Sequence, residues 1–181
     1  MELTYPETAL DDGVVLLRKW QEDDISCIKQ AATDPRIPES TTVPALCTPE
    51  AAKEFIYRQW RRNKEGEGLS LAIANSISNE AVGLLWLAVR PQHDVLGIGY
   101  WIVPNARGRG VGSRAVHLAT DWALQTQGAA RVEAWVEPDN FASLHLLTSA
   151  GFTREGVLRS FLSFDNRRAD AVVFSRLPQD D

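Results

Sequence analysis

The feature that most constrains this chain is a glycine-rich segment, residues 107–113, between a predicted strand and a predicted helix. Three glycines and two arginines share its seven positions. Glycine carries no Cβ that would hold a ligand away from the backbone, and the first amides of a helix lack acceptors within the helix. Those amides and the positive end of the helix dipole attract anions, while arginine adds charge-assisted hydrogen bonds. The segment therefore predicts a pyrophosphate site.

Two common phosphate-binding motifs are excluded. The chain has no Gly-x-x-x-x-Gly-Lys-Ser/Thr, and a Gly-x-Gly-x-x-Gly pattern started at Gly108 places Ser113 where the third glycine belongs. A P-loop nucleoside triphosphatase and a dinucleotide-binding Rossmann enzyme are thus disfavoured. The alternative interpretation of the segment is a glycine-rich turn whose arginines are solvated.

The remaining elements predict a mixed α and β architecture. Apolar runs and period-two alternation predict strands at residues 14–18, 69–75, 81–89, 97–103, 131–136, 153–164 and 168–176. Helices are expected after Asp23 and Asp24 up to Pro35, from Pro49 onward, over 112–127, and after Asn140. An antiparallel first half and a strand–helix–strand crossover make a mixed sheet flanked by helices, the α+β class. No repeat or linker divides the chain, so we expect one domain over residues 1–181.

Composition narrows the class of protein. The 19 basic against 24 acidic side chains give a net charge of −5, which argues against a nucleic-acid partner. Cys27 and Cys47 have neither metal-ligand spacing nor the number needed for a disulfide framework, so no metal site is expected. The chain opens without a signal-peptide pattern, and no apolar run is long enough to span a bilayer. We therefore expect a cytoplasmic protein with no membrane partner.

A second set of motifs accompanies the glycine-rich segment. These motifs are Leu16-Leu17-Arg18-Lys19-Trp20 with Asp23-Asp24, Gly99-Tyr100-Trp101, Asn140-x-x-Ser143, Gly151-Phe152, and Glu155-Gly156-x-Leu158-Arg159. Together with Arg-x-x-Gly-x-Gly, their order resembles the GNAT N-acetyltransferases, specifically the RimJ/RimL-like branch, from about residue 14 to 177. The resemblance implies a mostly antiparallel sheet flanked by helices, with a central pair of splayed strands.

The resemblance also implies acetyl-CoA as co-substrate and assigns residues to it. The implied pyrophosphate site consists of Arg107 with the main chain of Arg109, Gly110, Val111, Gly112 and Ser113. The implied contacts to the pantetheine arm come from Ile102, Val103 and Asn140, with Ser143 near the thiol. Asn140 and Ser143 are three residues apart, so on a helix both can face one ligand. The alternative is that Asn140 caps its helix while Ser143 lies on a solvated face.

The implied reaction is direct transfer of an acetyl group to a primary amine in a ternary complex. A backbone amide at the end of the 97–103 strand would polarise the thioester carbonyl, and Ser143 would protonate or hydrogen-bond the sulfur. A covalent acyl-enzyme is disfavoured because the chain lacks a nucleophile-elbow motif and a suitable Ser–His–Asp arrangement.

The general base is not identified. Family members often carry a glutamate on the strand before the glycine loop, but the corresponding position here is Gly97. Glu133, His93, Asp94 and Glu137 are alternatives, although such residues are more often solvated or structural. His117 follows the glycine loop, and His145 lies beside Ser143 along the chain.

Two of the six tryptophans are candidates for the acceptor site. Trp101 and Trp135 lie near the ends of the strands expected to flank the thioester, so they could wall an acceptor pocket. Packing roles are expected for the others, namely Trp20, Trp60, Trp86 and Trp122. By resemblance, residues 22–65 form the acceptor-specific region.

The expected partner is therefore an amine-bearing peptide or small molecule, and the RimJ/RimL-like branch favours a peptide α-amine. The alternative function is a non-catalytic module that binds acyl-CoA as a sensor or assembles with a partner, an alternative kept open by Gly97. The terminal hairpin offers an edge through which a homodimer could form.

Overall fold

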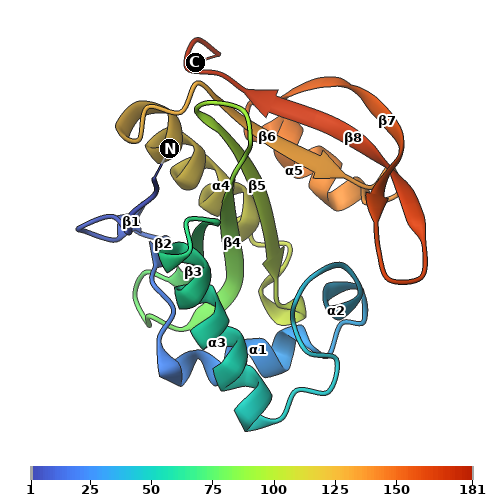
Figure 1. Ribbon diagram of the computed structural model, residues 1–181. Helices are drawn as coiled ribbons and strands as arrows, with labels where there is room; N and C mark the ends of the chain where they lie inside the picture. The colour runs from blue at the N-terminus through green and yellow to red at the C-terminus, as the bar shows by residue number, and fades with distance from the viewer. Residues whose placement is uncertain (1, 181) are drawn as a thin grey trace.

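The computed structural model describes residues 2–180; Met1 and Asp181, the ends of the predicted domain, lie outside the described residues. One eight-stranded sheet with helices on both faces confirms the predicted α+β class (Figure 1). The strands are β1 (Leu10–Asp11), β2 (Val15–Arg18), β3 (Gly68–Asn75), β4 (Ala81–Val89), β5 (Val95–Ile102), β6 (Arg131–Val136), β7 (Thr153–Ser163) and β8 (Arg168–Arg176).

Apart from the short α2, the helices begin close to the positions that the sequence predicts. They are α1 (Ile25–Ala31), α2 (Arg36–Ser40), α3 (Pro49–Lys64), α4 (Val111–Asp121) and α5 (Phe141–Ser149), with 3-10 turns at Glu22–Asp24 and Pro104–Ala106. Helix α3 starts as expected, because the Thr48 hydroxyl accepts a hydrogen bond from the Ala51 amide at 3.2 Å and Pro49 needs no acceptor. Helix α4 runs on as a π-helical turn, Trp122–Thr126, and the chain turns at Gly128, whose φ is +73°.

The sheet has the order β1-β2-β3-β4-β5-β6-β8-β7, and every neighbouring pair is antiparallel except β5 and β6. The parallel pairing of β5 with β6 is short, since it ends where Gly97 lies opposite Glu133. Beyond this point the two strands separate, which confirms the expected splayed pair. Each remaining half-strand therefore has one edge without a partner strand.

Alternation along the strands directs side chains to two separate cores. Leu71, Leu85 and Leu87 point to the face covered by α4 and α5, whereas Ala72 and Leu84 point to the face covered by α1 and α3 (Figure 1). The near-continuous apolar sequence of β4 is explained by this burial on both sides.

The sequence does not predict every element of the fold. Strand β1 has two residues and α2 has five, so neither produces a periodic pattern of useful length. The terminal hairpin is present as predicted, but its second strand, β8, lies beside β6 and leaves β7 at the edge of the sheet. Hydrophobic alternation alone does not decide which strand of a hairpin takes the inner place.

A buried ion pair ties the start of the chain to the middle of the sheet. The guanidinium of Arg18 donates two hydrogen bonds of 2.8 Å to the Asp24 carboxylate, and both side chains are less than a tenth exposed. The same guanidinium reaches the side chain and carbonyl of Asn79 in the β3–β4 turn, while Asp24 also accepts from the Gln21 amide. Asp24 thus fixes the turn before α1, rather than capping α1 through its side chain as predicted.

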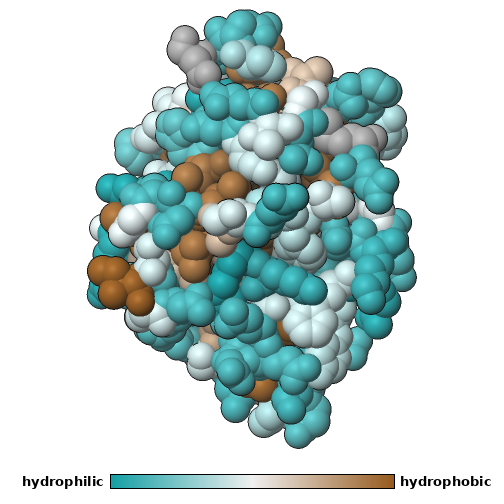
Figure 2. Space-filling view, turned by 90° about the vertical axis from the view of Figure 1, so that its left-hand side faces the viewer, coloured by the Kyte–Doolittle hydropathy of each residue, from teal (hydrophilic) through white to brown (hydrophobic). Residues whose placement is uncertain are grey.

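The outer surface is mainly polar on the side where β1 and α3 lie. Figure 2 shows hydrophilic residues over most of that face, with hydrophobic residues gathered in a small area. Among residues 2–180, no helix combines the length and the apolar character that crossing a bilayer requires.

The Arg18–Asp24 pair provides a test of this fold. Replacing Asp24 by Ala leaves a buried guanidinium without its carboxylate, so we expect the free energy of unfolding to fall by about 3–5 kcal/mol. Urea denaturation followed by tryptophan fluorescence measures the loss. Asp23→Ala, an exposed neighbour, should change the free energy by no more than about 0.5 kcal/mol. Equal effects of the two substitutions would contradict the assigned role of the pair.

Candidate functional site

The glycine-rich segment forms the turn that leads into α4. Gly108 and Gly110 have φ values of +73° and +76°, a region that most residues avoid. Gly110 is the N-cap of α4, and the first hydrogen bond within the helix runs from the Arg114 amide to the Gly110 carbonyl at 3.1 Å. The amides of residues 111–113 therefore have no acceptor within the helix, and the N-cap supplies no side-chain acceptor.

Gly112 brings this turn close to α5. A Cβ at Gly112 would lie 2.8 Å from Cδ1 of Leu146, so a larger residue there would require the Leu146 side chain to shift. A cavity of about 480 Å³, called the loop cavity below, opens between the turn and α5. Among its lining residues are the predicted Ile102, Arg107, Gly110, Val111, Gly112, Ser113, Asn140 and Ser143.

The two predicted arginines differ in their surroundings. Arg107 donates from Nε to the Ile102 carbonyl at 2.9 Å and pairs through its terminal nitrogen with Asp34 at 2.7 Å. Its guanidinium thus ties the glycine turn to the segment between α1 and α2. Arg109 is exposed and is not among the lining residues of the loop cavity.

The free edge of β5 presents backbone groups to the opening between β5 and β6. Val103 is buried, and its amide donates to the Val82 carbonyl of β4 at 2.9 Å. Because amides along an antiparallel strand point alternately to its two edges, those of Tyr100 and Ile102 point away from β4. The predicted backbone contact at the end of this strand is therefore available from Tyr100 and Ile102, and Val103 is already engaged.

Asn140 and Ser143 lie together at the start of α5. The Asn140 side-chain oxygen accepts a hydrogen bond from the Ser143 amide at 3.2 Å, so the predicted capping role is confirmed. The side-chain nitrogen of Asn140 is left over for another partner. Both residues line the loop cavity, so capping is compatible with binding a ligand there.

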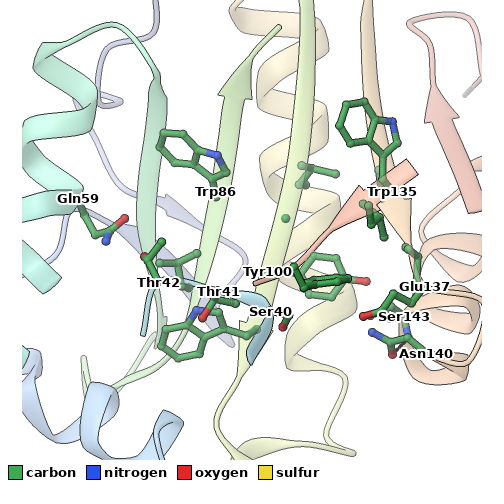
Figure 3. A pocket seen from close by; sticks show the side chains of 18 of the residues that line it. Ser40, Thr41, Thr42, Gln59, Trp86, Tyr100, Trp135, Glu137, Asn140 and Ser143 are labelled. Atoms are coloured by element: carbon green, nitrogen blue, oxygen red, sulfur yellow. Dashed lines mark hydrogen bonds between the residues drawn. The ribbon is translucent and has the colours of Figure 1, made fainter. Parts of the chain in front are cut away.

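Tyr100 lies beside this pair and was not assigned a role from the sequence. Its ring is packed in the core, and its hydroxyl is buried without a hydrogen bond that meets the usual geometry. Burial raises the pKa of Tyr100 to about 12, an effect that the nearby Ser143 side chain opposes. The phenol therefore stays protonated at neutral pH. Figure 3 shows its hydroxyl pointing toward Ser143.

A second cavity, of about 340 Å³, adjoins the loop cavity on the side of α3. We call it the aromatic cavity, because Phe55, Trp86, Tyr100, Trp101, Trp135 and Phe164 line it. The two cavities have six lining residues in common, which are Ser40, Thr41, Tyr100, Trp101, Asn140 and Ser143. A group held in one cavity can therefore meet a group held in the other at this shared wall.

Three of the tryptophans line the aromatic cavity, two of which were predicted to wall an acceptor pocket. Trp101 and Trp135 both line the aromatic cavity; Trp101 also packs against Trp20, and Trp135 is in edge contact with Phe161. Trp86, predicted to pack, is half-buried against the core on the side of α1 and α3, and it also lines the same cavity. Its alternation on β4 could not reveal this, because core and cavity lie on the same face of the sheet.

An arginine occupies the space above Gly97. A Cβ at Gly97 would lie 2.4 Å from a guanidinium nitrogen of Arg90, whose guanidinium carbon also lies 3.7 Å from the centre of a Trp135 ring. Glu133, opposite Gly97, is held between Arg90 at 3.2 Å and Arg131 at 3.3 Å. Neither Arg90 nor Glu133 lines the aromatic cavity.

Of the other candidate bases, only Glu137 lines the aromatic cavity. Both of its carboxylate oxygens accept hydrogen bonds from Arg167, which also donates to Glu39 of α2 at 2.9 Å. His145 is exposed and lines the loop cavity, whereas two further pairs, His93–Asp94 and His117–Asp121, lie outside both cavities.

Comparison with known proteins identifies a family. The family model of the acetyltransferase (GNAT) domain matches residues 15–153. One relative, the uncharacterized N-acetyltransferase p20 of Bacillus licheniformis, is 28% identical over 181 residues, covering 99% of this chain and 98% of that protein.

Solved structures show the same fold at lower identity. RimJ of Mycobacterium smegmatis in complex with CoA-disulfide has a TM-score of 0.81 and 22% identity, covering 96% of this chain and 86% of that one. Ribosomal-protein-S5-alanine acetyltransferase from Vibrio fischeri has a TM-score of 0.77 and 20% identity, covering 96% and 98%.

Proposed function

Since this chain belongs to the GNAT acetyltransferase domain family and is an acetyl-CoA-dependent N-acetyltransferase, we propose that it transfers the acetyl group directly to a primary amine in a ternary complex. The observation that carries this proposal is the wall common to the loop cavity and the aromatic cavity. We assign the loop cavity to acetyl-CoA and the aromatic cavity to the acceptor, so that thioester and amine meet at Tyr100 and Ser143.

The loop cavity suits the diphosphate of acetyl-CoA. The unpaired amides of Val111, Gly112 and Ser113 converge at the positive end of α4, which favours a bound anion. A Cβ added at Gly108 or Gly110 would meet nothing within 4 Å, so it is the backbone conformation that requires glycine at both positions. Arg107 supports the turn through Asp34 and Ile102 and adds a positive charge at the rim.

The free edge of β5 suits the extended pantetheine arm and the acetyl group. The backbone groups of Tyr100 and the amide of Ile102 can pair with the amides of that arm as a neighbouring strand would. Acetyl-CoA supplies an activated acyl group when bound. A strand amide directed at the thioester carbonyl oxygen would stabilise the negative charge that develops there.

Ser143 is the proposed donor to the departing sulfur. It lies on the wall common to both cavities, at the first turn of α5, where its amide is fixed by Asn140. The protonated phenol of Tyr100 points at its side chain and provides a donor behind it. Together they place two hydroxyl groups where the two cavities meet.

The acceptor enters through the aromatic cavity. An α-amine with a pKa near 8 is about one-tenth neutral at pH 7, so it needs less help from a base than a lysine side chain does. Glu137 offers a carboxylate near Ser143 that can attract the ammonium form, although Arg167 already neutralises much of its charge. A peptide α-amine is therefore the proposed acceptor class, consistent with the ribosomal-protein acetyltransferase among the structural neighbours.

Release of free CoA tests the proposal directly. The protein is incubated with acetyl-CoA and pooled peptide and small-molecule amines, and thiol is measured against a control without amine. Acceptor-dependent release is the expected result. Tight binding of acetyl-CoA with no acceptor-dependent release would instead indicate the non-catalytic acyl-CoA-binding module.

The glycine turn provides a test of acetyl-CoA binding. Gly110→Asp places a negative charge beside the diphosphate, and we expect at least tenfold weaker binding by calorimetry, or about 1.4 kcal/mol. Gly110→Asn is the matched control, because asparagine also tolerates positive φ but carries no charge. It should lose less affinity than the aspartate variant. Wild-type affinity in a folded Gly110→Asp protein would reject the site.

Ser143 provides a test of the chemical step. Ser143→Ala should lower kcat by about 10²-fold while the Kd for acetyl-CoA changes little, since the hydroxyl acts on the leaving group. Ser149→Ala, at the other end of α5, serves as the control and should retain wild-type kcat. Equal losses in turnover and in acetyl-CoA binding would remove the proposed role.

A further inference from the structure

The aromatic cavity extends from the wall shared with the loop cavity to the buried face of α3. Ser143 and Asn140 lie at one end in Figure 3, and Gln59 of α3 lies at the other. Gln59 is 1% exposed. Its side-chain amide is the uncharged polar group that α3 contributes to the cavity lining. A ligand reaching from Ser143 to the far end therefore meets Gln59.

The orientation of the Gln59 amide is fixed by its surroundings. Its nitrogen donates to the Phe55 carbonyl at 3.1 Å, and the flipped amide would place two oxygens face to face. The side-chain oxygen, Oε1, is buried and has no hydrogen-bond partner among the described residues. Buried polar atoms without a partner are uncommon in folded proteins and call for an explanation. Oε1 points toward the cavity in Figure 3.

The walls between the two ends are mostly apolar, and Ser40, Thr41 and Thr42 add hydroxyl groups to them. The apolar part of the lining includes Leu84, Trp86, Trp101, Trp135 and Phe164. The hydroxyls of Ser40 and Thr41 already donate to carbonyls of α2 residues. A molecule that fills this space needs an apolar body.

Gly99 of β5 lines the cavity, and no side chain fills the space in front of it. A Cβ at Gly99 would meet nothing within 4 Å, and no positive φ requires glycine at this position. The missing side chain therefore serves neither packing nor backbone conformation. Its effect is to keep space beside Trp86, the residue opposite it on β4.

Arg62 is the charged residue that α3 contributes to the cavity, and its guanidinium is partly engaged by other residues. Its Nε donates to Glu67 at 2.7 Å, and its guanidinium lies 3.7 Å from the centre of a Trp86 ring. Gln59 Oε1 is left as the unsatisfied acceptor at this end.

We propose that Gln59 is a specificity-determining residue that selects amines whose apolar body ends in an N–H or O–H donor, which Oε1 accepts. This inference rests on the proposed function, since it takes the aromatic cavity to be the acceptor site. An acceptor that lacks the donor leaves Oε1 unpaired, and a site built around a hydrogen bond discriminates strongly against such an analogue.

Matched amines test the proposal on the full chain. Tyramine and phenethylamine differ only in a terminal hydroxyl, as do tripeptides that begin with tyrosine or phenylalanine. We expect kcat/KM, measured by CoA release, to favour the hydroxyl-bearing member by at least about tenfold. Gln59→Met, which keeps the length of the side chain but removes the acceptor, should bring this ratio to about one. Arg58→Met places the same side chain on the exposed face of α3 and should keep the wild-type ratio.

Binding provides a second readout that does not depend on turnover. Quenching of tryptophan fluorescence, with CoA present, gives Kd values for both members of each pair. A preference in Kd that Gln59→Met abolishes supports the inference even if no amine is acetylated, in which case the proposed function alone fails. Acetylation with a ratio unchanged by Gln59→Met overturns the inference and leaves the function standing.

Two further outcomes would also overturn the inference. One is the absence of any difference between the members of a pair in both readouts. The other is a preference for 4-(2-aminoethyl)benzoate, which would assign the far end to Arg62. Gly99→Val serves as the steric control, because its side chain should weaken both members of a pair alike.

Discussion

The separation of β5 from β6 is the constraint on which the rest of the site depends. Two neighbouring parallel strands normally satisfy each other's backbone groups, but here pairing stops at Gly97 and Glu133. The remaining edge of β5 can pair with an extended ligand in place of a strand. The same opening lets Tyr100 reach Ser143 on α5, so that the loop cavity and the aromatic cavity have a common wall.

Sequence reasoning succeeded for the local features that depend on backbone conformation. The glycine turn, the cap at Asn140 and the strands on either side are local features, and each produces a local pattern of glycine, capping or alternation. Tyr100 was missed because the sequence pattern around a tyrosine in an apolar strand does not show whether its hydroxyl faces a cavity or the core. Gln59 was missed for a similar reason, since only the fold shows that its partner is lacking.

The region above Gly97 shows how a missing side chain can be replaced from elsewhere in the chain. The resemblance led us to expect a glutamate there, but the guanidinium of Arg90 fills the space and Glu133 balances its charge from the next strand. The local charge is thus rearranged without leaving a void. Under the proposed function, help in removing the amine proton then comes from another group or from solvent, which suits an amine of low pKa.

Strand β5 carries the parts of the site on successive residues. Gly99 opens the floor of the aromatic cavity, Tyr100 faces Ser143, and Trp101 packs against Trp20. If the pairing register of β5 shifted by one residue, the strand would still present backbone amides along its edge. Every side chain of the strand, however, would then point to the opposite face of the sheet. Evolution toward a different acceptor can therefore alter the surrounding helices and the hairpin tip, whereas an insertion or deletion in this strand would dismantle the whole arrangement at once.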